Sequence, residues 1–247
     1  GDLGLSSDPG PCAIISPQFS GGIPRDYPSG ERAANRVALT EQSMYIDFGE
    51  MTPQQVYITM TQTVIPRPIA WVLSENPDST LNLAPYSYFN AVSSNPALVM
   101  ISAGVKPDGG IKDTRDNIRD RRDFVVHIAS FEQLDDMNAS SASLDPGISE
   151  VEKLGLATAP LEGSRLPRLA DARVAFACSL YDIHYIGAGP QSLILGEVHG
   201  VFVDDCAIGE DAKGRRKILA QNINPIGRLG AGEYVSFGEV MTRERPD

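Results

Sequence analysis

The sequence Arg67-Pro68-Ile69-Ala70-Trp71-Val72-Leu73 decides the fold, together with the later stretch Asn82-Leu83-Ala84-Pro85-Tyr86-Ser87-Tyr88-Phe89-Asn90-Ala91-Val92-Ser93-Ser94-Asn95-Pro96. Residues 68–73 are apolar at every position, which predicts a strand that is covered on both faces. The turn residues Asn76-Pro77-Asp78-Ser79 predict a hairpin from this strand into residues 81–84. A second apolar strand, Leu98 to Ser102, precedes Lys112-Asp113-Thr114 at the start of a predicted helix. Amides, hydroxyls and a cation among apolar strands suit a flat heteroaromatic ring that carries a phosphate.

The rest of the chain is predicted to be mostly strand, with few and short helices. Residues 1–45 hold closely spaced Pro and Gly and are interpreted as an irregular N-terminal arm, which leaves residues 46–247 as one domain. The expected elements are a helix that starts at Thr52 and Pro53 and stops before Pro66, a helix capped by Asp113 or Thr114, helices at 132–142 and 149–154, and strands at 124–129, 174–186 and 192–204. This order favours a mainly β protein, one antiparallel barrel with peripheral helices, over a doubly wound sheet.

Composition narrows the function classes. The net charge of -11 and the pI near 4.7 argue against binding to the phosphate backbone of nucleic acids, so any phosphate site must concentrate its cations locally. The cysteines Cys12, Cys178 and Cys206 are odd in number and form no CxxC pair, which indicates neither a disulfide framework nor a zinc site. No apolar run approaches the roughly 20 residues of a membrane span. These features predict a soluble, cytoplasmic protein without nucleic-acid or membrane partners.

Several segments in this order resemble the flavin reductase-like family, which includes flavoredoxin and uses the FMN-binding split barrel. The resemblance runs from about residue 50 to residue 237 and rests on residues 66–72, 82–93, 112–114 with 117–118, 137–140, 195–198 and 231–234. It implies a six-stranded antiparallel Greek-key split barrel, a homodimer and one FMN per subunit near the dimer interface. It also implies an FMN-dependent oxidoreductase that passes electrons from NAD(P)H or another donor to free flavin or a partner protein. The alternative is a flavoredoxin-like electron carrier without turnover of its own on nicotinamide.

The resemblance assigns roles by position. Residues 82–90 would border the isoalloxazine ring with backbone amides and the side chains of Ser87 and Asn90, while Lys112 and Thr114 would hold the phosphate. The full set of expected cofactor-binding residues is Arg67, Asn82, Ala84, Pro85, Tyr86, Ser87, Asn90, Ser102, Lys112, Asp113, Thr114 and Tyr234. No catalytic residue is assigned, because the hydride chemistry at N5 belongs to the cofactor.

Some of these residues have a second interpretation. Arg67, fixed between two prolines, can point to the phosphate or the pyrimidine end of the flavin, or pair with a surplus carboxylate. Lys112 can be solvated while Asp113 or Thr114 only caps the helix. Pro85 in a strand indicates a bulge or an edge. Tyr234 can reach a flavin ring across the dimer or simply pack.

The remaining aromatic and imidazole side chains are interpreted as structural. Trp71 is assigned to the core. The three histidines, His127, His184 and His199, lie in predicted strands at spacings that resemble no metal set. Residues 189–191 read Gly-Pro-Gln where short flavin reductases of similar fold often carry Gly-Asp-His, the histidine of which faces the nicotinamide. Flavoredoxin-like members lack that signature too.

Overall fold

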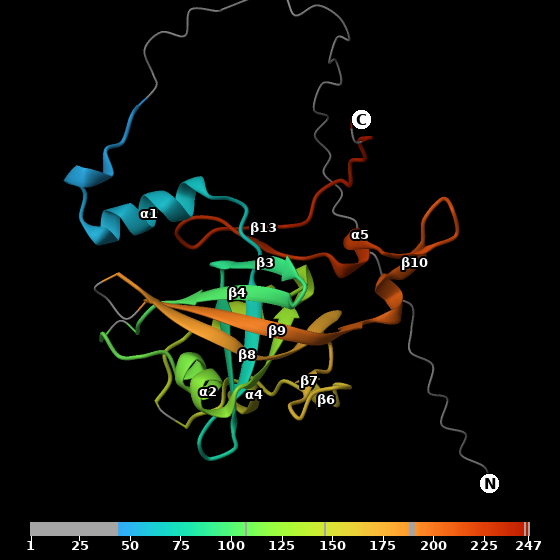
Figure 1. Ribbon diagram of the computed structural model, residues 1–247, viewed down its shortest axis with the longest axis horizontal. Helices are drawn as coiled ribbons and strands as arrows, with labels where there is room; N and C mark the ends of the chain where they lie inside the picture. The colour runs from blue at the N-terminus through green and yellow to red at the C-terminus, as the bar shows by residue number, and fades with distance from the viewer. Residues whose placement is uncertain (1–43, 107, 146, 188–190, 245, 247) are drawn as a thin grey trace, which may run out of the picture. The chain divides into compact units, whose positions relative to one another are not determined.

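The computed structural model describes residues 44–247 except 107, 146, 188–190, 245 and 247 (Figure 1). The predicted arm at residues 1–45 therefore lies almost wholly outside the described residues. The chain divides into two compact units, residues 1–59 and residues 60–247. In the first unit, the Thr52 hydroxyl accepts a hydrogen bond from the Gln55 amide at 3.3 Å, and Pro53 begins a helix, as predicted.

The second unit is built on one antiparallel sheet. Its strands are β1 (Ala70–Glu75), β2 (Leu81–Tyr86), β3 (Phe89–Ser94), β4 (Ala97–Ala103), β5 (Asp123–Ile128), β8 (Val174–Ile186) and β9 (Gln191–Val203). Their order in the sheet is β2-β1-β5-β8-β9-β4-β3, and every neighbouring pair is antiparallel. The hairpin predicted from residues 76–79 joins β1 to β2.

The two edge strands of this sheet are consecutive in the chain. β2 and β3 are separated only by Ser87 and Tyr88, yet β2 pairs with β1 while β3 pairs with β4. The segment therefore passes from one edge to the other and closes the sheet into a barrel. This break also explains why the sheet has seven strands where six were expected: the pairing partner changes at Ser87 and Tyr88, so one segment counts as two strands.

Besides the barrel strands, the described residues form helices and short hairpins (Figure 1). The helices are α1 (Pro53–Thr63), α2 (Asp113–Arg121), α3 (Leu134–Ala139), α4 (Glu150–Lys153) and α5 (Ala220–Ile223), with single 3₁₀ turns at Phe48–Glu50, Phe131–Gln133 and Asp205–Ala207. The hairpins are β6 (Thr158–Ala159) with β7 (Arg168–Leu169), β10 (Ile208–Glu210) with β11 (Arg216–Ile218), and β12 (Gly227–Arg228) with β13 (Tyr234–Val235). The helix expected at 132–142 is shorter than predicted, because a 3₁₀ turn takes up its start and the helical bonds end at Ala139.

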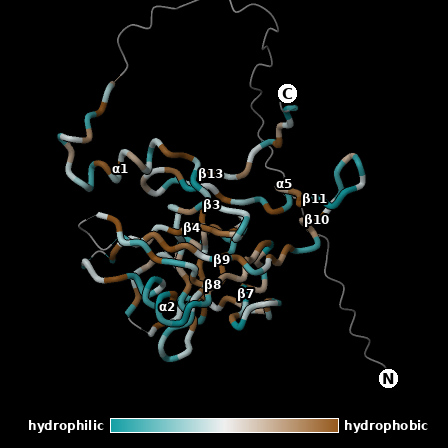
Figure 2. Tube along the Cα trace, viewed as in Figure 1, coloured by the Kyte–Doolittle hydropathy of each residue, from teal (hydrophilic) through white to brown (hydrophobic). Residues whose placement is uncertain are grey.

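Strand β1 separates two apolar layers. Trp71 and Leu73 point into one layer, whereas Ala70 and Val72 point into the other, which fills the barrel. This alternation is why every position of the strand had to be apolar. Figure 2 shows the hydrophobic residues gathered along the strands and a hydrophilic trace along α2. Trp71 is fully buried, as predicted, and its indole Nε1 donates to the Ser140 hydroxyl at 2.9 Å.

Buried His127 has the structural role that the sequence predicted, whereas His184 and His199 are exposed. The Nδ1 of buried His127 donates to the Trp71 carbonyl at 3.0 Å, and its Nε2 accepts from the Leu169 amide at 3.0 Å. His184 pairs with Asp182, and His199 lies 2.7 Å from the Ser179 hydroxyl. Within the described residues there is no cluster of three or more His, Cys, Asp or Glu side chains that could hold a metal ion. None of the described helices is long and apolar enough to cross a membrane.

The burial of His127 gives stability a pH dependence. Burial lowers the pKa of His127 from 6.5 to about 4, and only the neutral ring can accept the Leu169 amide bond. Between pH 6.5 and pH 4 the unfolded chain therefore binds a proton at His127 that the folded chain does not bind. The contribution of His127 to the free energy of unfolding is complete above pH 6.5 and is lost as the pH falls toward 4. We expect the free energy of unfolding in urea to be about 2–3 kcal/mol lower at pH 4.5 than at pH 7.5 through this group.

His127→Gln separates this effect from that of the carboxylates. The variant should be less stable at pH 7.5. It should also show a smaller difference in the free energy of unfolding between pH 7.5 and pH 4.5, because glutamine does not titrate. An unchanged difference between the two pH values would contradict this role for His127.

Candidate functional site

One cleft brings together half of the expected cofactor-binding residues. It lies where β2 meets the start of α2, and α4 and residues 140–144 close it. The expected residues that line it are Asn82, Ala84, Tyr86, Lys112, Asp113 and Thr114. Two charged residues that the sequence did not single out, Lys106 and Glu150, line it as well.

Strand β2 presents its alternate residues to this cleft. Successive side chains of a strand point to opposite faces, so Asn82, Ala84 and Tyr86 share one face, while Leu83 on the other packs in the core layer of Trp71. The Asn82 amide donates to the Thr114 hydroxyl at 2.8 Å, which ties β2 to the first turn of α2. The short polar side chain of β2, Asn82, therefore connects to the helix start and is not part of a solvated strand face.

The start of α2 differs from the prediction. Lys112 is the N-cap residue, its side chain makes no capping bond, and Asp113 is the first helical residue. The expected cap at Asp113 or Thr114 is wrong because both side chains are engaged elsewhere: Asp113 pairs with Lys106 at 2.8 Å and Thr114 accepts from Asn82. In the part of the chain that the structure describes, the Lys112 ammonium has no ion pair or hydrogen bond. A free ammonium beside the first N–H groups of a helix is an arrangement that attracts anions.

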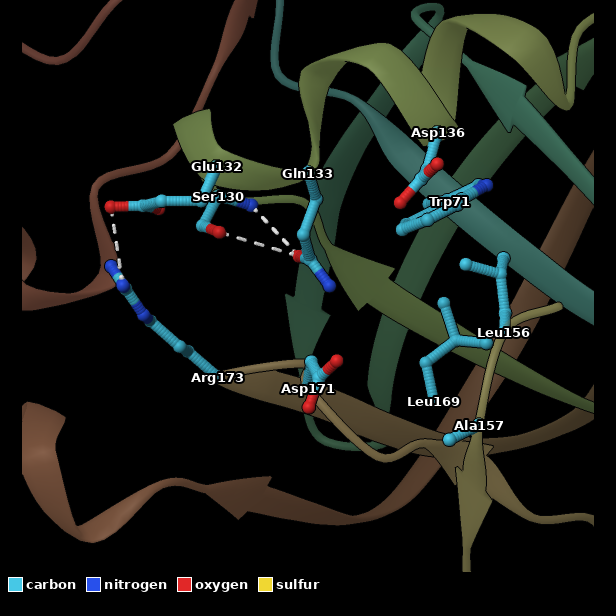
Figure 3. A pocket seen from close by; sticks show the side chains of 10 residues that line it. All are labelled: Trp71, Ser130, Glu132, Gln133, Asp136, Leu156, Ala157, Leu169, Asp171 and Arg173. Atoms are coloured by element: carbon cyan, nitrogen blue, oxygen red, sulfur yellow. Dashed lines mark hydrogen bonds and ion pairs between the residues drawn. The ribbon is translucent and has the colours of Figure 1, made fainter. Parts of the chain in front are cut away.

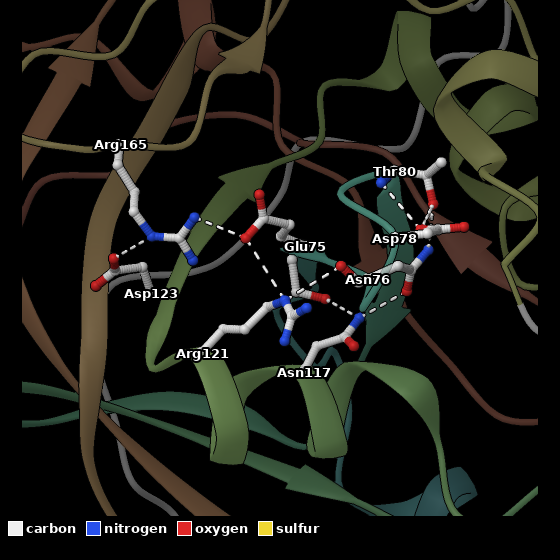
Figure 4. Close-up of polar contacts among 9 residues, drawn as sticks. Glu75, Asn76, Asp78, Thr80, Asn117, Arg121, Asp123 and Arg165 are labelled. Carbon is white, nitrogen blue, oxygen red and sulfur yellow. Dashed lines mark hydrogen bonds and ion pairs between the residues drawn. The ribbon is translucent and has the colours of Figure 1, made fainter.

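Helix α2 is anchored to the β1–β2 hairpin by polar contacts (Figure 4). The Asn117 amide donates to the Asn76 side chain at 2.8 Å and to the Ser74 hydroxyl at 3.2 Å, in buried positions. Arg121 donates to the Asn76 carbonyl at 3.1 Å. Because these groups are largely shielded from water, the contacts hold the orientation of α2 more firmly than surface pairs would. They fix the direction in which the helix start faces the cleft.

Two buried polar groups of the cleft differ in their partners. Tyr86 is 8% exposed, and its hydroxyl has no hydrogen-bond partner of acceptable geometry among the described residues. Burial raises the pKa of Tyr86 above its usual range, and the nearby Thr114 hydroxyl opposes that shift without cancelling it. Glu150 is also 8% exposed, but its carboxylate accepts from the Leu83 amide at 2.9 Å. Burial raises the pKa of Glu150, Asp113 adds to the shift, and the Leu83 amide and Lys106 oppose it. The cleft thus holds a protonated donor, Tyr86, that lacks an acceptor.

Arg67 lies outside this cleft. Its side chain is buried, and the guanidinium donates to the main-chain oxygens of Thr61, Val64 and Leu229, the last two at 2.8 and 2.7 Å. Its Nε lies 3.5 Å from the Ser87 hydroxyl. Most N–H groups of the Arg67 guanidinium therefore donate to main-chain oxygens. The sequence could not predict the contact with Leu229, because Leu229 is remote in the chain.

The other expected residues are distributed around the barrel. Pro85 lies in edge strand β2 without a register shift, so the edge interpretation holds; the only shift between β3 and β4 falls at Ala91 and Ser93. Asn90 is exposed, and its side chain accepts from the amide of Ala91. The Ser102 hydroxyl accepts from the Gln191 amide at 2.5 Å.

Tyr234 contacts residues of the same chain. Its hydroxyl donates to the Asn138 side chain at 2.9 Å, and its ring lies 4.4 Å from the Arg228 guanidinium carbon. The packing interpretation therefore describes Tyr234 in this chain.

A second cleft is lined by Trp71 and contains none of the expected residues (Figure 3). Glu132 and Arg173 pair across it at 3.2 Å, and the Gln133 side chain accepts from the Ser130 amide at 3.1 Å. Arg173 also donates to the Asn222 carbonyl. These polar groups satisfy one another, in contrast to Lys112 and Tyr86.

Comparisons with known proteins agree on the type of fold. The family model described as "Flavin reductase like domain" matches residues 60–219. Nitrilotriacetate monooxygenase component B from Bacillus cereus is 32% identical, with a TM-score of 0.75 over 83% of this chain and 100% of that chain. The 2-nitrobenzoate 2-nitroreductase of Pseudomonas fluorescens is 30% identical, with a TM-score of 0.70 over 82% of this chain and 96% of that one.

A more distant structure defines the architecture. This structure is a putative flavin reductase with a split barrel domain from Shewanella frigidimarina. It has a TM-score of 0.70 at 17% identity, over 83% of this chain and 100% of that chain. A likeness at this identity shows the fold alone. The predicted mainly β split barrel is confirmed.

Proposed function

Because this chain belongs to the flavin reductase-like family, as its sequence motifs indicated, we propose that it is an FMN-dependent oxidoreductase. In this proposal it takes electrons from NAD(P)H or another donor and passes them to free flavin or to a partner protein. The observation that carries the proposal is the cleft at the start of α2, which is lined by the Lys112 ammonium and the Tyr86 hydroxyl, two groups without a hydrogen-bond partner among the described residues. A phosphate ester supplies the acceptor oxygens that both groups lack.

The residues of this chain bind and orient the cofactor. Lys112 and the first N–H groups of α2 would hold the phosphate, and the Thr114 hydroxyl, whose oxygen accepts from Asn82, keeps its own proton for donation. The segment from Asn82 to Asn90 would border the ring along the edge of the barrel. FMN supplies the hydride chemistry, so the protein needs no acid or base of its own for that step. The proposal includes the homodimer that the resemblance implies, and the exposed apolar side chains of Val92 and Tyr185 support a surface that a second copy covers.

An electron carrier is the second candidate. It is supported by the sequence at 189–191, which lacks the histidine that faces nicotinamide in short flavin reductases, and by Gln191, whose amide is already bound to Ser102. Such a protein would receive electrons from a partner and would turn over slowly or not at all with nicotinamide.

Flavin binding and reduction test the proposal together. We expect the purified full chain, after incubation with FMN and gel filtration, to keep the visible absorbance of bound flavin. Rapid mixing with NADH or NADPH under anaerobic conditions should bleach that absorbance, and added free FMN should give multiple turnovers. A bound flavin that only dithionite or a partner protein reduces would favour the carrier. A chain that binds no FMN would contradict both.

A further inference from the structure

We propose that Lys106 is a second phosphate-binding cation of this site and that Asp113 holds its ammonium in place. This inference rests on the proposed function and adds a ligand to it. Nothing in the sequence motifs marked Lys106, which precedes the Lys112-Asp113-Thr114 motif by six residues.

The loop between β4 and α2 brings Lys106 beside Lys112. Val105 and Ile111 form an antiparallel bridge across the loop, and the Lys106 amide donates to the Gly110 carbonyl at 2.7 Å. Lys106 directly follows Val105, and Lys112 directly follows Ile111. Both side chains line the cleft, one from each arm of the loop.

The charge balance of the cleft requires a second cation. Asp113 and Glu150 place two carboxylates in its wall, and Lys112 alone supplies one positive charge against them. A phosphate with up to two negative charges would then approach a net negative surface. With Lys106 the charges of the four side chains sum to zero, so the positive end of α2 provides the net attraction.

Asp113 positions Lys106 and leaves some of its ammonium N–H groups free to donate. The contact of 2.8 Å occupies one of the three ammonium donors, and the side chain is only 18% exposed. Lys106 is therefore held close to the start of α2, partly shielded from water, with donors left for phosphate oxygens. A partly desolvated cation binds an anion more strongly than a fully hydrated one.

The experiment compares two flavins that differ only in the phosphate. Dissociation constants of the full chain for FMN and for riboflavin are measured by flavin fluorescence for the parent, Lys106→Met, Lys106→Arg and Lys217→Met. We expect Lys106→Met to weaken FMN binding about tenfold, since one charge-assisted hydrogen bond is lost, and to change riboflavin binding less than about twofold. Lys106→Arg should restore most of the FMN affinity. Lys217 lies in exposed strand β11, so Lys217→Met removes the same charge elsewhere and should leave both constants unchanged.

The outcomes distinguish this inference from the function on which it rests. If Lys106→Met weakens FMN and riboflavin equally, or leaves FMN affinity unchanged, Lys106 is not a phosphate ligand even though the chain binds flavin. If the parent binds neither flavin, the proposed function fails and this inference fails with it. Urea unfolding of each variant shows whether a loss of affinity comes from a loss of folding.

Discussion

Replacing Lys112 with alanine should weaken FMN binding by about 100-fold, the largest loss expected from any single side chain of the cleft. Lys112 is the N-cap of α2, and no described residue neutralises its ammonium, whereas Lys106 already shares its charge with Asp113. Its full charge is therefore available to the phosphate, next to the positive end of the helix. Loss of a charged hydrogen bond costs about 1.5–3 kcal/mol, and the upper value corresponds to about 100-fold in the dissociation constant.

The controls for Lys112→Ala follow from the same charge argument. Lys217→Ala makes the same change to the net charge of -11 at an exposed site far along the chain, so it separates local contact from long-range attraction. Riboflavin binding should be nearly unaffected by Lys112→Ala, because riboflavin has no phosphate. Added salt should weaken FMN binding more in the parent than in the variant. A variant that retains FMN as tightly as the parent would refute the phosphate site at α2.

Local sequence patterns predicted the elements of the barrel well. The uninterrupted apolar run at residues 68–73 predicted a strand that is buried on both faces. In the structure, β1 lies between two core layers, which is why all of its first positions are apolar. The turn at residues 76–79 gave the β1–β2 hairpin, because the turn residues and the strands that they join are adjacent in the chain. The burial of Trp71 and the structural role of His127 followed from their places in apolar strands.

The parts that sequence reasoning missed depend on contacts between distant residues. Glu150 reaches the cleft because its short helix packs on β2, 67 residues earlier in the chain. Lys106 reaches it because Val105 and Ile111 form a bridge across a loop; the residues Asp108-Gly109-Gly110 favour a turn there, but they do not show that the turn places Lys106 in the cleft. Arg67 holds Leu229, 162 residues away, so its structural role could not be inferred from the two prolines beside it. The motif Lys112-Asp113-Thr114 predicted a binding site at the start of α2, where the structure has a cleft, while the pairing of its aspartate required the structure.

Replacing Gly196 with alanine should destabilise the fold more than any other single methyl group added to a strand of the barrel. A Cβ at Gly196 would lie 2.4 Å from Cζ of Phe124 and 3.2–3.3 Å from both Cε atoms. Phe124 is fully buried and belongs to the apolar layer that fills the barrel. Overpacking of this kind costs about 1–3 kcal/mol and occasionally more, and we expect about 3 kcal/mol from urea unfolding because the contact is with the tip of a ring that the whole core surrounds.

Gly200 provides the matched control on the same strand, and Phe124 provides the rescue. A Cβ at Gly200 would meet nothing within 4 Å, so Gly200→Ala should be neutral or slightly stabilising, as expected where alanine replaces a glycine of higher unfolded-state entropy. Phe124→Leu removes the ring that the new methyl group would strike, so it should recover part of the loss when combined with Gly196→Ala, although it is destabilising alone. Equal stability of the Gly196→Ala and Gly200→Ala variants would mean that β9 can move away from Phe124. In that case the close contact between this glycine and the Phe124 ring would not be what fixes the position of β9 in the barrel.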